Sequence, residues 1–228
     1  MAVMATRHTE APERRLTVDD LEHTPDDGRR YALVDGCCDV SPAPVPRHRS
    51  VDSPLTFRLA DKAPDEFTVL TGPGVNLNAD RTHDRIPEPA AFGCVPPDRG
   101  HRQVPPVPAV EIVSPESVLR DNHTTRAEYA AFGIASYWII SPLPDKVGIV
   151  EFRLEDGPYQ EVAQACGEEV LETELPFPVR FVPHRPTTRG PWREHIGGRS
   201  EEGTTGTGCP PSPSRDVTPG APWYVFST

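Results

Sequence analysis

Two acidic residues lie in apolar surroundings where a carboxylate needs a partner. Glu111 interrupts the apolar run Val110–Val113, and Glu88 lies between two prolines just after Ile86. A charge there is costly unless it is paired or binds a metal ion. Alternatively, Glu111 faces water from an edge strand, and Glu88 is solvated near a strand end. If both approach one ion, Mg²⁺ suits them, because it takes carboxylate oxygens and keeps several waters; such an ion polarises a phosphoryl oxygen and lowers the pKa of a bound water.

Other constellations that carry chemistry are absent from the sequence. It contains neither a Gly-rich phosphate-binding motif nor the G-x-S-x-G turn of serine hydrolases. The five cysteines are odd in number and form no C-x-x-C pair, so we expect reduced thiols. His48, between Arg47 and Arg49, either contacts a phosphate or belongs to a solvated basic turn. The chain has only two lysines, Lys62 and Lys146, against 21 arginines, so a lysine-dependent mechanism must use one of these two.

Strand-like segments dominate the chain and would position both carboxylates. Glu111 lies on a predicted strand over 109–113, and a short apolar segment carries Glu88. We expect hairpins where turn residues separate two strands, at Asp35-Gly36 and at 155–157. The predicted strands besides 109–113 are 31–34, 37–40, 67–70, 75–77, 86–92, 136–140, 148–154, 159–163, 169–171 and 177–182.

About three helices are interleaved with these strands. A short helix is predicted over 17–23, and a longer one over 47–62, in which Pro54 should kink or break the helix. The third, over 126–132, is expected to end at Gly133. This mixture of strands and helices indicates an α/β or α+β protein.

Composition and charge bound the architecture. The chain has 228 residues and a formal net charge of −11, and 46 residues are Pro or Gly. We expect a flexible arm over 1–16, one domain over 17–185 and an irregular to disordered tail over 186–228. The longest largely apolar stretch, 129–140, is too short to cross a membrane, and the absence of a signal-peptide pattern favours the cytoplasm. The acidic balance argues against a protein that coats nucleic acids, but not against a site that meets a few phosphates through a metal ion.

Several segments resemble one nuclease family. They include AVEIVSPES, which contains Glu111, GPGVNLNADRTHDRIPEP, which contains Glu88, RAEYAAFGIASYWIISP and LTVDDLEHTPDDGRRYALVDG. Over about Leu16 to Pro183 the chain is similar to the Uma2 family of restriction endonucleases, in the PD-(D/E)XK superfamily. The resemblance implies a restriction-endonuclease-like mixed β-sheet flanked by helices, with β-hairpins at both ends. It also implies Mg²⁺- (or Mn²⁺-) dependent hydrolysis of DNA phosphodiesters, and leaves the oligomeric state open, a homodimer included.

The resemblance assigns roles to individual residues. The family's strand glutamate matches Glu111 and its Pro-Asp matches Pro87-Glu88, so Glu88 and Glu111 are the implied metal ligands. The superfamily lysine falls at Val113, and the lysine that this family places on the following helix falls at Thr125. Neither residue is charged. Arg126 is adjacent and is the substitute cation that we expect, although one residue turns a helical side chain by about 100°.

Two further departures bear on activity. The family's glutamate after the hairpin tyrosine falls at Ala32, and its Gly-Glu falls at Gly36-Cys37. Thr125 also has a structural interpretation, because 125–128 has the sequence of a capping box. Two hypotheses follow: an active but impaired nuclease, and a catalytically inactive descendant that binds a nucleic acid or a protein. The two missing lysines favour weak or absent activity.

Overall fold

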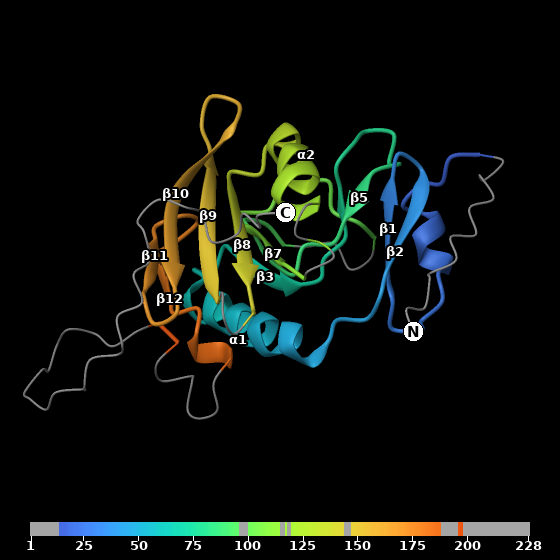
Figure 1. Ribbon diagram of the computed structural model, residues 1–228. Helices are drawn as coiled ribbons and strands as arrows, with labels where there is room; N and C mark the ends of the chain where they lie inside the picture. Colours follow the sequence, from blue (N-terminus) through green and yellow to red (C-terminus); the bar gives the residue numbers. More distant parts are fainter. Residues whose placement is uncertain are drawn as a thin grey trace, which may run out of the picture.

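A six-stranded mixed sheet forms the centre of the computed structural model, which describes residues 14–95, 100–114, 117, 120–143, 147–187 and 196–197 (Figure 1). The strand order is β10-β9-β8-β7-β6-β3. Strands β7 and β8 run parallel, and every other neighbouring pair in this sheet is antiparallel. The strands are β3 (Thr68–Thr71), β6 (Pro89–Phe92), β7 (Ala109–Ile112), β8 (Ser136–Ser141), β9 (Gly148–Leu154) and β10 (Tyr159–Cys166).

A second, four-stranded sheet contains the N-terminal hairpin, in blue in Figure 1, and is ordered β2-β1-β5-β4. Its strands are β1 (Arg30–Val34), β2 (Cys37–Ser41), β4 (Val75–Asn76) and β5 (Asp84–Arg85), and a separate hairpin pairs β11 (Leu171–Thr173) with β12 (Val179–Phe181). The helical segments are η1 (Asp20–His23), α1 (Pro46–Lys62), η2 (Arg120–Thr125, a π-helical turn), α2 (Arg126–Phe132) and η3 (Arg185–Thr187). The predicted α+β class and both hairpins are confirmed.

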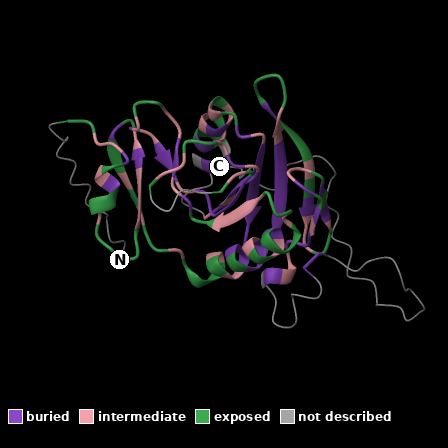
Figure 2. Ribbon diagram, turned by 180° about the vertical axis from the view of Figure 1, so that it is seen from behind, coloured by how far each residue is buried: buried purple, intermediate pink, exposed green. Residues whose placement is uncertain are grey.

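The central strands separate two apolar cores. Strands β7 and β8 are apolar almost throughout because helices cover both faces of the sheet. Helix α1 packs against one face, where Val110 and Ile112 point, and α2 packs against the other, where Ala109 and Val113 point. Figure 2 shows the buried central strands and the exposed outer side of α1. Because side chains alternate along a strand, Glu111 lies on the α2 face.

Helix α1 continues through Pro54, so the predicted break is wrong. The helix runs unbroken from Pro46 to Lys62 with Pro54 inside it, although a proline cannot donate the N–H that position would supply. Val51, Leu55 and Leu59 of the same helix are almost completely buried against the sheet. This packing stabilises the helix across the proline, as tertiary contacts commonly do.

The ordered fold extends past the predicted boundary at 185. Ile196 is only 1% exposed and belongs to the core beneath α1, and its carbonyl oxygen accepts a hydrogen bond from the Val182 N–H at 2.7 Å. At the other end, the Leu16 N–H donates to the Gly36 carbonyl oxygen at 3.0 Å. The predicted arm before residue 14 and the tail after 200 lie outside the described residues. Among the helices that the structure describes, none combines the length and apolarity needed to span a bilayer.

Candidate active site

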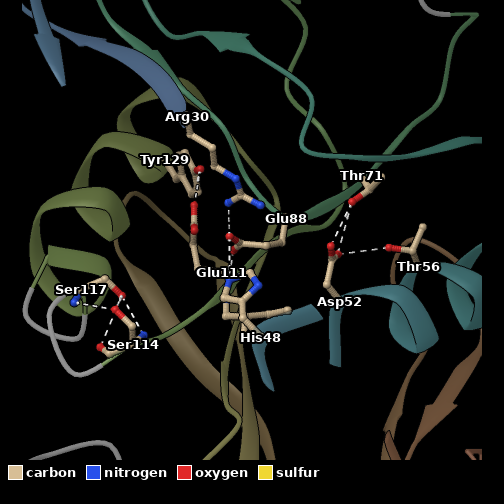
Figure 3. Close-up of polar contacts among 11 residues, drawn as sticks. Arg30, His48, Asp52, Thr56, Thr71, Glu88, Glu111, Ser114, Ser117 and Tyr129 are labelled. Atoms are coloured by element: carbon tan, nitrogen blue, oxygen red, sulfur yellow. Dashed lines mark hydrogen bonds and ion pairs between the residues drawn. The ribbon is translucent and has the colours of Figure 1, made fainter. Parts of the chain in front are cut away.

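A cavity of about 610 Å³ lies where the two sheets meet. Residues of β1, β2, α1, β5, β7 and η2 contribute to its wall, together with the segment that precedes β6. Glu88, Glu111 and Thr125 all line it, so the structure brings together three of the four residues singled out in the sequence. Ala32 lines it too. Figure 3 shows Glu88 and Glu111 side by side, with Arg30 and His48 approaching Glu88.

Glu88 is held by donors on both of its carboxylate oxygens. Its side chain is 5% exposed. Oε1 accepts from Arg30 Nη1 and lies 3.0 Å from His48 Nε2, and Oε2 accepts from the Ile112 N–H at 2.9 Å. Burial alone would raise the pKa of Glu88, but the His48 contact, the Arg30 charge and the Ile112 N–H together lower it below its ordinary value. Glu88 is therefore a charged carboxylate in a buried setting.

The pKa of Glu111 is shifted in the opposite direction from that of Glu88. Burial raises the pKa of Glu111 well above its ordinary value, and the negative charges of Glu88 and Asp121 raise it further. The Tyr129 hydroxyl of α2 donates to Glu111 Oε1 at 2.7 Å and opposes this shift. The two carboxyl groups thus interact directly, since the negative charge of Glu88 is one cause of the raised pKa of Glu111.

Thr125 lies in the cavity wall and does not cap α2. It is 2% exposed, its backbone is helical (φ −61°, ψ −39°), and its side chain makes no capping hydrogen bond. The other half of the predicted capping box, Glu128, instead receives two hydrogen bonds from Arg85, at 2.7 and 2.8 Å. The capping interpretation is therefore wrong.

The structure does not bring Arg126 to the carboxylates. Its guanidinium lies over the Phe152 ring, 4.1 Å from the centroid, and Nη2 donates to the Tyr159 carbonyl oxygen at 3.1 Å. Arg126 lines a second cavity, of about 540 Å³, and not the one that holds Glu88 and Glu111. Arg126, the expected substitute cation, thus points away from Glu88 and Glu111 because of its position on the helix.

Three other basic residues line the main cavity: Arg30, His48 and Arg85. Arg30 and Ala32 share one face of β1, while Leu33 points to the opposite side and packs with the η1 segment. The alternative that His48 belongs to a solvated basic turn is wrong, since its side chain is 12% exposed and contacts Glu88. The alternation of side chains along β1 is the only sequence pattern that could have placed Arg30 beside Ala32.

No lysine among the described residues reaches the cavity wall. Lys62, at the end of α1, lies 3.0 Å from Asp61, and Lys146 is outside the described residues. Val113 is buried in the core beneath α2. Both positions at which a nuclease lysine was expected therefore lack a charge.

The donor chemistry at Glu88 and Glu111 fits a hard divalent cation. Within the described part of the chain, no three His, Cys, Asp or Glu side chains are grouped around a common metal position. Mg²⁺, however, is commonly bound through one or two carboxylates and waters. The raised pKa of Glu111, caused in part by the Glu88 charge, reflects a repulsion that such a cation would relieve.

Comparisons with known proteins identify the family and the fold. A solved structure described as a putative nuclease belonging to DUF820, from Anabaena variabilis, matches with a TM-score of 0.53 and 15% identity, covering 69% of this chain and 89% of that chain. At this identity the likeness establishes a shared restriction-endonuclease-like fold. A search of curated proteins finds no match. The family model for Uma2, described as "Putative restriction endonuclease", matches residues 18–184, and the chain therefore belongs to the Uma2 family.

Proposed function

We propose that this chain is a metal-dependent nuclease of low activity that hydrolyses phosphodiester bonds in DNA, with the Glu88–Glu111 cavity as its active site. One observation carries the proposal. Four of the positions at which the family resemblance places site residues, 32, 88, 111 and 125, lie on separate segments of the chain and line the same cavity, whereas Cys37 and Val113 do not line it. Such convergence is expected of a site inherited as a unit.

Glu88 and Glu111 would hold Mg²⁺ or Mn²⁺. When bound, the ion supplies a Lewis acid that polarises the phosphoryl group and lowers the pKa of a coordinated water. The protein's own part is orientation and charge. The Ile112 N–H fixes Glu88, and the Tyr129 hydroxyl fixes Glu111. Arg85 adds positive charge to a wall that an anionic phosphate must approach, and His48 lies beside Glu88 in the same wall.

Low activity follows from what the wall lacks. Thr125 offers a neutral hydroxyl where the family has a lysine, and Ala32 offers a methyl group where it has a glutamate. One preorganised electrostatic contact to a reacting group is typically worth about 10²–10³ in rate. The same two neutral residues favour the second candidate function, a catalytically inactive descendant that only binds nucleic acid.

A plasmid-nicking assay with Mg²⁺ or Mn²⁺ tests both functions. Thr125→Lys should raise nicking by about 10²-fold, because it restores a cation at the buried wall position. Thr124→Lys is the matched control, since residue 124 is exposed and the same charge then faces solvent. Glu111→Gln should abolish nicking in either background.

The outcomes separate the candidates. Nicking by the wild type that Glu111→Gln removes supports the nuclease. If the wild type does not nick the plasmid and Thr125→Lys does, the result supports the inactive descendant. Nicking that survives both Glu88→Gln and Glu111→Gln would overturn the assignment of this cavity as the active site.

A further inference from the structure

Glu88 already has a cationic partner, Arg30, on the carboxylate group that a metal ion would also use. Arg30 reaches it from β1 of the smaller sheet, so this ion pair crosses from one sheet to the other. The Arg30 side chain is 22% exposed and that of Glu88 is 5% exposed. The charge of Arg30 is therefore applied to Glu88 with little screening by water.

Most acceptor positions of Glu88 are in use. A carboxylate has about four lone-pair positions. Arg30 and His48 both approach Oε1, and the Ile112 N–H occupies one position on Oε2. A Mg²⁺ ligand bond of about 2.0–2.1 Å cannot form at an oxygen position already filled by a donor hydrogen. The Ile112 N–H belongs to the strand backbone and is fixed, so the side chains on Oε1 are the groups that can move.

We propose that Arg30 is an internal counter-ion that competes with the divalent cation for Oε1 of Glu88, so that the cation reaches this oxygen only when the Arg30–Glu88 ion pair opens. The inference rests on the proposed function, because it takes Glu88 and Glu111 as the metal ligands. Ala32 strengthens it, since the same face of β1 carries no carboxylate that could draw Arg30 away from Glu88. The resident ion pair lowers the affinity of this chain for metal.

Titration calorimetry with MnCl₂ on the full chain tests the inference. Arg30→Gln should bind Mn²⁺ at least tenfold more tightly than the wild type, because no cation then has to be displaced. Arg29→Gln is the matched control: Arg29 is the preceding residue, is largely exposed and lies 3.4 Å from Asp27, so its loss should leave the affinity unchanged. Adding Glu111→Gln to Arg30→Gln should abolish binding.

Failure of the Arg30 competition and failure of the metal site give different results. If the wild type and Arg30→Gln bind Mn²⁺ equally and Glu111→Gln abolishes the binding, the competition is overturned and the metal site stands. If no protein shows binding that depends on Glu111, the metal site itself fails, and the proposed function fails with it.

A second measurement follows Arg30 in the wild type, because Arg30→Gln also removes a charged partner of the buried Glu88 and can lower stability. The ¹H–¹⁵Nε resonance of Arg30 is identified by its loss in Arg30→Lys and is followed while MgCl₂ is added to the wild type. Release from Glu88 should move this resonance toward that of a solvated arginine, in step with shifts of the Glu111 backbone amide. A Glu111 amide that responds to Mg²⁺ while the Arg30 resonance stays fixed would contradict the competition.

Discussion

At the scale of single residues, this protein buries several carboxylates and stabilises each one differently. Glu88 contacts the side chains of Arg30 and His48. Glu151 accepts hydrogen bonds from Ser136 and Arg153 at 3.2 and 3.1 Å. Asp52 of α1 is surrounded by hydroxyl groups, those of Thr71 and Thr56, as Figure 3 shows. Charged groups of this kind are buried only with partners, and each of these carboxylates has a different set of them.

Asp84 gives a pH-dependent prediction. It is fully buried in β5, its Oδ1 lies 2.5 Å from His101 Nδ1, and burial raises the pKa of Asp84 above its ordinary value although His101 opposes the shift. The folded state then binds this proton more tightly than the unfolded state, so stability is lost as the pH rises above about 4, the ordinary pKa of aspartate. Asp84→Asn removes this loss. We expect its unfolding free energy to improve relative to the wild type between pH 4 and pH 7.

Urea unfolding across this pH range measures the difference. The control is Asp80→Asn, at an exposed residue four positions earlier, whose difference from the wild type should stay constant with pH. A difference for Asp84→Asn that moves in favour of the wild type as the pH rises would contradict the prediction.

The residues of the site were predictable only in part from the sequence. Glu88 and Glu111 could be found because each is a charge in apolar surroundings, which is unusual in a strand. Arg30 was missed although it alternates with Ala32 along β1, because the strand was predicted to begin at Tyr31, and His48 was missed because a histidine in a basic run is typical of exposed positions. Arg126 was placed wrongly because a shift of one residue on a helix changes the face on which a side chain lies.

At the scale of elements, α1 contains a proline at an interior position that disfavours a helix. Proline in a helix interior is about 3 kcal/mol less favourable than alanine, and Pro54 lies inside α1. Pro54→Ala should therefore raise the unfolding free energy, by about 1–2 kcal/mol once the lost packing of this buried ring is subtracted. Pro46→Ala is the control at the first helical position, where proline is well suited, and should change stability by less than about 0.5 kcal/mol. Lower stability in Pro54→Ala would show that ring packing outweighs the backbone cost.

Elements with strong local patterns were predicted well. The apolar strands β7 and β8 and the helix α2, with its Gly133 cap at φ 88°, agree with the sequence. Strand β5 was missed, because two charged residues show no strand periodicity; they pair with the nearby β4 and with β1, which is distant in sequence. Ile196 was missed because it is one apolar residue in a polar stretch, although it completes the main core.

At the scale of the whole molecule, the site depends on how the two sheets are joined. Positions 32 and 125 line one cavity although one belongs to the hairpin and the other precedes α2. No local pattern brings them together, and only the resemblance to a family predicted their shared role. The junction itself contains a buried fork: Arg85 of β5 binds Glu128 of α2 through Nε and Nη2.

The fork should hold α2 against the smaller sheet. The side chains of Arg85 and Glu128 are 8% and 17% exposed, whereas a second bidentate pair, in which Nη1 and Nη2 of Arg81 bind Asp19, is 40% and 64% exposed. Double-mutant cycles in urea unfolding, with Arg→Gln and acid→amide substitutions, compare the two. We expect a coupling energy of about 1–3 kcal/mol for Arg85–Glu128, because partial burial reduces screening, and below about 1 kcal/mol for the exposed pair. Equal coupling in both pairs would mean that the buried pair does not hold the junction. Tyr129 follows Glu128 directly and contacts Glu111, so a loosened junction should also weaken the Tyr129–Glu111 hydrogen bond and with it the orientation of the active-site carboxylate.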